Sequence, residues 1–575
     1  MRRIAKYLKP YIGQILVVLV LVYVQAMTDL QLPDYMSRIV NEGVLIGDNG
    51  VILSIGLKMI AVTLLGAVCT IAAGFLAARV ATGYARDLRS AVFNKVENYS
   101  LSEFNKFSTA SLITRTTNDV QQVQMVMIIF LRMIVMAPIM AIGGLTKAIG
   151  TNPSMTWIIA ASVLCRFVLM GLLFTLGLPK MKKMQSLVDR LNLVTRENLT
   201  GMRVIRAFNT EKYEEQRVDE ANRNLTKTSL FVNRLMVIMQ PFMMLLMNLT
   251  TVLIIWVGAN AVGAGTMQVG NMMAFMQYAM QIMFSFLVVA MIFIMIPRAS
   301  VSAGRIADVL ETESTILDPK DPVRHTDVKG QVAFKDVTFT YPGAEAPALE
   351  HISFTARPGE TTAIIGSTGS GKSTIINLLP RFYDTTTGTI EIDGVPIQAM
   401  SQHDLRDKIG FVPQKGILFS GTIRSNIAYG APDISEEEIW RAADIAQATE
   451  FISQLEHGLD TPIAQGGTNV SGGQKQRLSI ARALAKKPEI YIFDDSFSAL
   501  DFKTDAALRK ALKENVEEAT MIIVAQRIST VVDAEQIIVL DEGKIAGIGK
   551  HRDLMRDCEV YREIALSQLS EEELA

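Results

Sequence analysis

Cysteine and histidine are scarce in this sequence of 575 residues, and their positions exclude two kinds of site. The three cysteines, Cys69, Cys165 and Cys558, lie far apart and lack the short spacings of zinc sites and disulfide frameworks. All five histidines follow residue 300, so the first half has no histidine-based metal site. An excess of positive charge is also missing, because the formal net charge is −1. A nucleic-acid partner is therefore not expected.

Charged residues are nearly absent from long stretches of the first half. A helix that spans a bilayer needs about 20 mostly apolar residues. Charge-poor stretches near or above this length are Tyr11–Thr28, Met59–Ala78, Val120–Thr146, Ala148–Pro179 and Leu235–Pro297. The last is long enough for two spans, and its glycine-rich middle, Gly258–Gly265, predicts a tight turn between them. The sequence therefore predicts six spans within residues 1–300, embedded in a lipid bilayer.

Arginine and lysine are distributed unevenly between the connections. The N-terminus and the connections after spans two and four are rich in both, whereas the turns near residues 41–52, 149–154 and 258–270 contain neither. By the positive-inside rule, both termini of this multi-pass chain lie on the cytoplasmic side of the plasma membrane. The two basic connections are long and favour helix. Within them we expect Ser102–Thr114 and Asn198–Phe208 to contact another domain.

The composition changes at residues 301–330, where prolines and mixed charges replace the apolar runs. We therefore divide the chain into a membrane domain (residues 1–300), a linker (301–330) and a second domain (331–575). In the second domain, short strand-like runs alternate with helical ones, which is typical of an α/β fold with a mainly parallel sheet.

A glycine-rich segment, Gly366-Ser-Thr-Gly-Ser-Gly-Lys-Ser373, has the G-x4-G-K-S pattern of a P-loop. It lies between the strand-like Thr361–Ile365 and the helical Thr374–Leu379, as that motif requires. In such a loop, backbone N–H groups surround phosphate, Lys372 reaches the β- and γ-phosphates, and the Ser373 hydroxyl binds Mg²⁺. The sequence thus predicts a site for ATP and Mg²⁺. Its residues are Gly366, Ser367, Thr368, Gly369, Ser370, Gly371, Lys372, Ser373 and Thr374.

Two further segments of the second domain are suited to the same chemistry. The strand-like run Glu489–Phe493 ends at Asp494, whose carboxylate suits a Mg²⁺ ligand. Between the two motifs, Val470–Arg477 contains a Ser-Gly-Gly turn that leads into a helix, a second potential phosphate site. One nucleotide does not need two cradles from one chain, so the second is expected to close a partner's site. Its residues are Ser471, Gly472, Gly473 and Gln474.

The ordered set of these motifs resembles the ABC ATPase domain, and the whole chain resembles the type IV (multidrug-type) ABC exporter half-transporter. The resemblance implies a helical six-span transmembrane domain followed by an α/β P-loop ATPase domain. It also implies a dimer that holds each ATP between one chain's Walker A loop and the other's signature loop, Ser471–Gln474 here. By the same resemblance, Tyr341 stacks on adenine, Gln414 lies near Mg²⁺ and the attacking water, and Asp501 belongs to the D-loop.

Two catalytic positions depart from the family pattern. Asp495 stands where a glutamate usually acts as general base, and its carboxylate is one methylene shorter. Gln526 stands where the family normally has histidine, and glutamine cannot carry charge or shuttle a proton. Together they resemble the degenerate-site subunit of heterodimeric bacterial multidrug exporters. That resemblance implies a partner half-transporter with a Walker B glutamate and a switch histidine. A slow homodimer with two Asp/Gln sites stays an alternative.

Methionine is unusually frequent in the last two predicted spans, and methionine-rich surfaces often bind varied ligands. The sixth span places Met273, Met276, Met280, Met283, Leu287 and Met291 at helical spacing. One interpretation is an adaptable cavity for amphiphilic compounds; the other is lipid contact or helix packing. Arg166 lies about 16 Å from the outer end of its span, which favours an inward position. Asp29 and Lys147 are candidates for an outer gate, or for snorkelling to the interface.

The function expected is ATP-driven export of drugs or other amphiphilic small molecules. A lipid flippase uses the same machinery on a bilayer component and is the first alternative. An ATP-gated regulator or channel is the second, although the intact signature loop and D-loop disfavour it.

Overall fold

A computed structural model describes residues 2–323 and 330–568 of the chain, which form two compact units. Unit 1 comprises residues 1–95 and 110–311, and unit 2 comprises residues 96–109 and 312–575. The predicted boundary at residue 300 falls inside a helix, α9 (Val269–Glu311). That helix continues because its last turns keep a buried apolar stripe, which includes Ala299, Ala303 and Ile306. The linker predicted at 301–330 therefore begins as helix.

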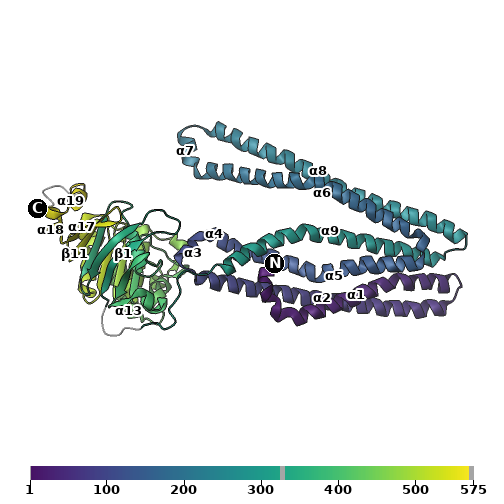
Figure 1. Ribbon diagram of the computed structural model, residues 1–575, viewed down its shortest axis with the longest axis horizontal. Helices are drawn as coiled ribbons and strands as arrows, with labels where there is room; N and C mark the ends of the chain where they lie inside the picture. Colours follow the sequence, from purple (N-terminus) through teal and green to yellow (C-terminus); the bar gives the residue numbers. More distant parts are fainter. Residues whose placement is uncertain (1, 324–329, 569–575) are drawn as a thin grey trace. The chain divides into compact units, whose positions relative to one another are not determined.

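Unit 1 is built from long helices, shown with their labels in Figure 1. They are α1 (Ile12–Arg38), α2 (Asn49–Glu97), α5 (Val120–Thr151), α6 (Thr156–Thr200), α8 (Glu211–Gly263) and α9. Helix α5 packs mainly on α9, and α6 packs mainly on α8. The short α7 (Met202–Ala207) joins α6 to α8 at the far end of that pair.

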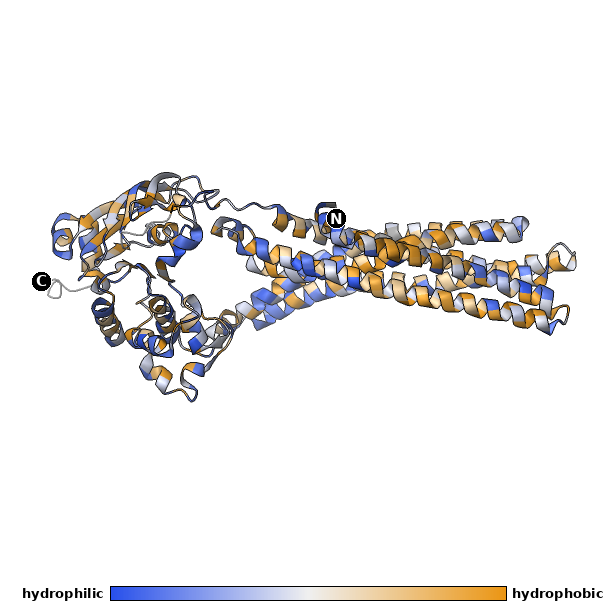
Figure 2. Cartoon of the chain, turned by 90° about the horizontal axis from the view of Figure 1, so that it is seen from below, coloured by the Kyte–Doolittle hydropathy of each residue, from blue (hydrophilic) through white to orange (hydrophobic). Residues whose placement is uncertain are grey.

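Five helical segments in the described part of the chain are long and apolar enough to cross a membrane. They are Arg3–Val44, Asn49–Glu97, Thr109–Thr151, Pro153–Thr200 and Glu211–Gly263. Hydrophobic residues cover much of the length of these helices, as Figure 2 shows. The sixth predicted span falls on α9, where the side chains of Leu287 and Met291 lie outside the described residues. The count of six thus stays a prediction.

The glycine-rich middle of the apolar stretch is mostly helix, so the predicted turn at Gly258–Gly265 is misplaced. Helix α8 continues to Gly263, and the turn follows, with Gly265 at φ +73°. Gly258 serves close packing instead, because a Cβ there would lie 2.7 Å from the sulfur of Met272. On α9, Met276 packs against the core of unit 1 and Met283 is buried. This part of the methionine stripe takes part in helix packing within the chain.

The acidic partner of Lys147 is Asp34, not Asp29. The Lys147 ammonium lies 2.5 Å from Asp34 Oδ2, and the buried Tyr278 hydroxyl donates to Asp34 Oδ1 at 2.6 Å. Asp34 therefore connects α1, α5 and α9. Asp29 and Asp34 both lie on α1, and helix packing places Asp34, which the sequence analysis did not name, beside Lys147.

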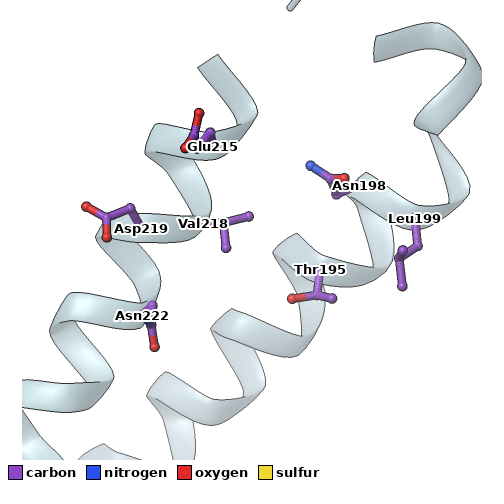
Figure 3. A pocket seen from close by; sticks show the side chains of 7 residues that line it. All are labelled: Thr195, Asn198, Leu199, Glu215, Val218, Asp219 and Asn222. Atoms are coloured by element: carbon purple, nitrogen blue, oxygen red, sulfur yellow. The ribbon is translucent and has the colours of Figure 1, made fainter. Parts of the chain in front are cut away.

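Near α7, the α6–α8 pair has a polar surface. A cavity of about 490 Å³ opens between the two helices and is shown in Figure 3. Its lining is Thr195, Asn198, Leu199, Glu215, Val218, Asp219 and Asn222. The Arg217 guanidinium also pairs with Glu197 across the two helices at 2.5 Å. Such polar and charged side chains would be costly in hydrocarbon, so this end fits an aqueous extension of the membrane helices.

Unit 2 contains two main sheets. The larger has the order β12-β11-β3-β10-β9-β6 and is parallel except for β12. Its strands are β3 (Thr361–Gly366), β6 (Ile409–Val412), β9 (Ile490–Asp494), β10 (Thr520–Val524), β11 (Gln536–Asp541) and β12 (Lys544–Gly549). The smaller sheet is antiparallel, with the order β2-β1-β4-β5. Its strands are β1 (Val332–Phe339), β2 (Leu349–Ala356), β4 (Thr387–Ile392) and β5 (Val395–Pro396).

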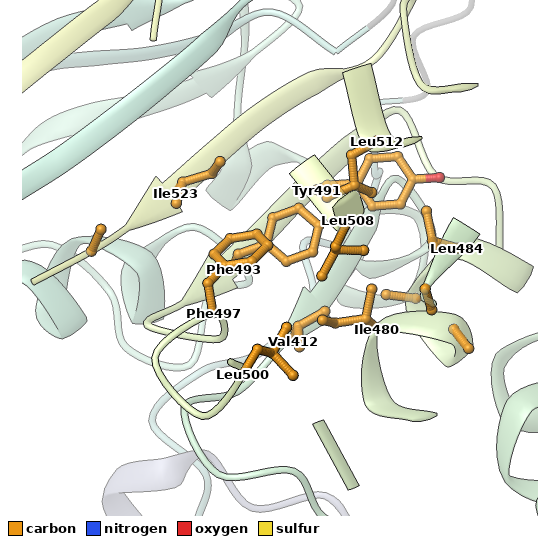
Figure 4. Packing of buried hydrophobic residues seen from close by; sticks show 14 of the residues in the cluster. Val412, Ile480, Leu484, Tyr491, Phe493, Phe497, Leu500, Leu508, Leu512 and Ile523 are labelled. Atoms are coloured by element: carbon orange, nitrogen blue, oxygen red, sulfur yellow. The ribbon is translucent and has the colours of Figure 1, made fainter. Parts of the chain in front are cut away.

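Buried apolar residues fix the larger sheet against its helices. Strand β9 is buried on both faces, as expected for a central parallel strand. Phe493 on β9 packs with Phe497 and Val412, and Ile480 of α15 (Gly472–Ala485) belongs to the same cluster (Figure 4). This core holds the carboxyl ends of the parallel strands in place, and the predicted site residues follow those ends.

A short segment between α2 and α5 belongs to unit 2. Helix α3 (Leu101–Lys106) lies in the predicted contact segment Ser102–Thr114, and Leu101 packs against the core of the smaller sheet. A capping box of Ser100 and the buried Glu103 begins the helix. Asn105 donates to the Tyr383 hydroxyl at 3.2 Å. The part of the first predicted contact segment up to residue 109 thus belongs to unit 2, whereas residues 110–114 belong to unit 1.

Candidate functional site

The predicted P-loop joins β3 to α10 (Lys372–Leu378) in the expected strand–loop–helix order. Gly369 and Gly371 have φ of +87° and +98°, the left-handed region that favours glycine. A Cβ on Gly371 would lie 2.6 Å from a methyl of Leu349, and one on Gly366 would lie 2.2 Å from the Leu540 carbonyl oxygen. The loop therefore needs glycine both for its turns and for close contacts. This is the cradle that a polyphosphate requires.

Lys372 and Ser373 begin α10 directly after this loop. The Lys372 ammonium donates to the carbonyls of Gly366 and Ser367, at 2.8 and 2.6 Å, so it already arches over the loop. Burial lowers its pKa, while the nearby carboxylates of Asp495 and Asp494 oppose that shift. The Ser373 hydroxyl lies 3.4 Å from Asp494 Oδ1. Serine and carboxylate oxygens are the donors that Mg²⁺ takes beside nucleotide phosphates.

Asp494 ends β9 and faces the P-loop. Burial raises its pKa, and the neighbouring charge of Asp495 raises it further. A divalent cation would relieve this repulsion between adjacent carboxylates. Among residues 2–323 and 330–568, no cluster of three His, Cys, Asp or Glu side chains is suited to hold a metal. Ser373 and Asp494 lie where they could hold Mg²⁺ together with the phosphates, and the place of Gln414 beside the ion stays a prediction, since its amide donates to Asp495.

Three predicted catalytic residues meet at the carboxylate of Asp495. Gln414 Nε2 donates to Asp495 Oδ2 at 3.3 Å, and Gln526 Nε2 donates to the same oxygen at 2.8 Å. They follow β6, β9 and β10, which are neighbours in the sheet. Asp495 itself has φ +45°, and its N–H donates to the Val524 carbonyl at 2.9 Å, so its backbone is fixed. Two amides therefore donate to one oxygen of the carboxylate that stands at the predicted general-base position.

Tyr341, which follows β1, lies beside the P-loop helix. Its hydroxyl is 3.0 Å from Thr374 Oγ1, and its ring meets that of Tyr383 edge to face, with centroids 5.3 Å apart. Tyr383 in turn accepts the hydrogen bond from Asn105 of α3. A chain of contacts thus runs from α3 through two tyrosine rings to the P-loop helix. Tyr383 is absent from the residues predicted by sequence, because it lies in no motif.

We expect Tyr383→Phe to loosen α3 and to leave ATP affinity within about twofold. The variant keeps the ring against Tyr341 and removes the hydroxyl that accepts from Asn105. A hydrogen bond of about 1 kcal/mol corresponds to roughly fivefold faster amide exchange in Leu101–Lys106, measured by hydrogen–deuterium exchange. Tyr341→Leu is the matched control and should weaken ATP binding without changing that exchange. Unchanged exchange in Tyr383→Phe would contradict the docking contact.

The predicted signature loop begins α15 and is open to solvent. Ser471 caps the helix, because its hydroxyl accepts from the Gln474 N–H at 3.3 Å and Gln474 Oε1 accepts from the Ser471 N–H at 2.9 Å. A Cβ on Gly472 would have nothing within 4 Å, whereas one on Gly473 would lie 3.4 Å from the Ala499 carbonyl oxygen. In the described part of the chain, no hydrogen bond joins Ser471–Gln474 to the P-loop.

Asp501 has a local role that the sequence did not suggest. It caps α16 (Phe502–Asn515), accepting from the Thr504 N–H at 3.0 Å and from the Thr504 hydroxyl at 2.7 Å. The N–H bond lowers its pKa. Both carboxylate oxygens are thus engaged in the helix cap, and a contact of Asp501 with nucleotide stays a prediction.

Gln568 is a second residue near the site that lies in no motif. It follows α19 (Glu559–Leu566), and its amide bonds the chain on both sides of Arg527. Oε1 accepts from the Ile528 N–H at 2.8 Å, and Nε2 donates to the Gln526 carbonyl at 2.8 Å. The backbone at Gln526 is therefore held from the C-terminal segment.

Comparison with known proteins matches one family model to each half of the chain. Residues 15–286 match the family model of the ABC transporter transmembrane region, and residues 349–498 match that of the ABC transporter. An uncharacterized ABC transporter ATP-binding protein of Mycobacterium tuberculosis is 42% identical over 567 residues, covering 98% of this chain and 97% of the relative. One of Bacillus subtilis is 37% identical over 578 residues, covering 100% and 99%.

Two further relatives have more informative descriptions. An ATP-dependent lipid A-core flippase of Thiobacillus denitrificans is 30% identical and covers 99% of this chain and 98% of the relative. A bacterial Atm1-family ABC exporter, solved with ATP bound, has a TM-score of 0.79 at 26% identity, covering 98% of this chain and 99% of that one. The predicted fold class, a helical transmembrane domain followed by an ATPase domain, is confirmed.

Proposed function

Since this chain belongs to the ABC transporter family, as an exporter half-transporter with a transmembrane region and an ABC ATPase, we propose that it is the degenerate-site subunit of a heterodimer. The ATPase hydrolyses ATP to translocate substrate across the membrane. In the proposed assembly, the chain's own site binds ATP and hydrolyses it slowly. Its signature loop completes the fast site of the partner, which carries a Walker B glutamate and a switch histidine.

The observation that carries this proposal is the arrangement around Asp495. The P-loop, Ser373 and Asp494 retain the geometry for ATP and Mg²⁺, whereas the base position holds a short carboxylate bound by two neutral amides. Both amides donate to Oδ2 of Asp495, so this oxygen is engaged by the chain's own side chains, and the shorter side chain ends one methylene before the usual position of the base. A positioned general base is typically worth about 10²–10⁴-fold in rate. We therefore expect the chain's own site to bind ATP tightly and to hydrolyse it slowly.

The second predicted contact segment supports a partner chain. Asn198–Phe208 includes α7, which has no buried residue, and leaves Val204 and Phe208 exposed by 60% and 74%. Apolar side chains at the tip of a polar helix pair favour docking on another protein. We assign this surface to the partner's ATPase domain. In this proposal the membrane half lies in the plasma membrane, and both termini are in the cytoplasm.

The transported class in this proposal is amphiphilic: drugs, or lipids as in the flippase relative. The likeness to that flippase favours the lipid alternative over an ATP-gated regulator or channel. The experiment that tests pairing also distinguishes this heterodimer from a homodimer with two slow sites.

We expect the purified chain alone to hydrolyse ATP poorly and co-expression with a partner bearing Glu and His to raise turnover at least tenfold. Steady-state phosphate release measures this turnover.

Under turnover, intact ATP should persist longer at Lys372 than in the partner's P-loop. Vanadate trapping and nucleotide analysis of each subunit would reveal this difference. Brisk hydrolysis by the lone chain, or ADP trapped equally in both subunits, would show that the pairing is wrong.

A further inference from the structure

Arg166 is a buried cation without a partner in the membrane region. It lies on α6, and only 9% of the residue is exposed. Its Nη1 atom is buried without a hydrogen-bond partner in the described part of the chain. An arginine at this depth is costly unless it meets an anion or an acceptor.

The chain's own sequence cannot supply the missing carboxylate from neighbouring helices. No aspartate or glutamate occurs in residues 120–188 or 221–307, which include all of α5 and the apolar parts of α6, α8 and α9. The side chains of α6 and α9 that are not described belong to residues 173, 174, 287 and 290–294, and all are apolar in sequence. Arg166 thus differs from Lys147, which pairs with Asp34.

Two contacts fix the direction in which this part of α6 faces. One turn before Arg166, the Ser162 hydroxyl lies 2.7 Å from that of Thr250 on α8. The ring of Phe167 meets that of Phe286 on α9 edge to face, with centroids 5.2 Å apart. Arg166 therefore lies on the side of α6 that approaches both α8 and α9, which is the interior of unit 1.

Apolar side chains precede Arg166 on α6 and pack against neighbouring helices. Ile159 on α6 belongs to a buried cluster, and Val163, Leu253 and Phe286 pack against it. The α6–α8 pair diverges from α9 toward α7, as Figure 1 shows. A single positive charge next to a hydrophobic cluster matches a ligand with an anionic head and an apolar tail.

We propose that Arg166 binds the anionic head group, a carboxylate or a phosphate ester, of an amphiphile carried by this transporter. The proposal rests on the export function above and names its substrate class. Charge-assisted hydrogen bonds from guanidinium to such a group are among the stronger ones in proteins, and they replace the missing intramolecular pair. The head group then pairs with the guanidinium, and the apolar tail packs against the hydrophobic cluster.

The test compares two probes with the same tail and opposite charge. Dodecyl phosphate and dodecyltrimethylammonium are titrated, without nucleotide, into the full-length chain with its partner in phosphatidylcholine nanodiscs. Wild type should bind the phosphate at least tenfold more tightly than the ammonium. Arg166→Gln should abolish that preference, and Arg166→Lys should keep part of it. Arg132→Gln, which removes an arginine from α5, is the matched control and should keep all of it.

Every outcome decides the proposal. If Arg166→Gln keeps the preference, or only lowers the unfolding temperature, the guanidinium has a structural role and the proposal is wrong. If the Gln variant does not fold, the Lys variant decides. A Lys variant that prefers dodecyl phosphate as strongly as the wild type does would also overturn the proposal. Native mass spectrometry with phosphatidylglycerol identifies the source: Arg166-dependent retention of that lipid shows a lipid head group. If the co-expressed pair binds the anionic probe through Arg166 but shows no ATP turnover, the proposed heterodimer is wrong. The proposed anion site would still stand.

Discussion

Gly472→Asp should nearly abolish ATP hydrolysis and transport by the heterodimer, whereas Lys372→Ala in the same chain should leave a measurable fraction of both. The two residues serve different nucleotides in the proposed assembly. Gly472 completes the partner's fast site, and Lys372 holds ATP in the slow site of its own chain. Donors that face the γ-phosphate stabilise charge that develops in the transition state, and losing one costs about 10²–10³-fold.

We expect Gly472→Asp to change the charge at this position without disturbing the fold. A Cβ at Gly472 would meet no atom within 4 Å, so we expect Gly472→Asp to fold normally. Its carboxylate would lie at the N-terminus of α15, where a partner's γ-phosphate is expected, and the two negative charges repel. Gly472→Asn has nearly the same shape without the charge and is the matched control. It should retain much more ATPase activity than the aspartate variant.

Lys372→Ala acts by a different route. The lysine spans the loop through two carbonyls, so its loss weakens ATP binding without touching the partner's chemistry. Steady-state ATPase and substrate efflux from the co-expressed pair measure both effects. A larger loss in Lys372→Ala than in Gly472→Asp would mean that the fast and slow sites are assigned to the wrong chains.

The double variant Asp495→Glu with Gln526→His should convert the slow site into a hydrolytic one. Because the backbone of Asp495 is fixed by its bond to Val524, one added methylene extends the carboxylate toward the expected water. Gln568 holds the backbone at Gln526, so a histidine there would start from a defined position. A positioned base and its orienting partner justify an expected gain of at least tenfold.

This gain is measured with the partner's own site silenced by Gln in place of its Walker B glutamate. The remaining phosphate release then comes from the converted site. Asp495→Asn with Gln526→His is the control and should stay inactive, because an amide cannot accept the proton. If the Glu/His variant is as slow as the parent chain, these two residues are not the cause of slow hydrolysis.

The sequence by itself determined the features whose physics is local. The P-loop needs glycine at Gly369 and Gly371 because of positive φ, and its spacing from Lys372 and Ser373 is fixed along the chain. Charge-free stretches of bilayer length likewise predict membrane helices without any contact between them. The two departures at Asp495 and Gln526 are also visible in sequence, because each is a change of residue type at a motif position.

Only the tertiary structure decided which distant residues meet. Gln414, Asp495 and Gln526 converge because β6, β9 and β10 are adjacent parallel strands whose carboxyl ends share one edge. The contacts of Tyr383 with α3 and of Gln568 with the Gln526 backbone join segments far apart in the chain and lie in no motif. The choice of Asp34 over Asp29 for Lys147, and the isolation of Arg166, depend on how the helices pack. Pairing of this kind is set by the burial of whole helix and strand faces, a property that no single segment carries.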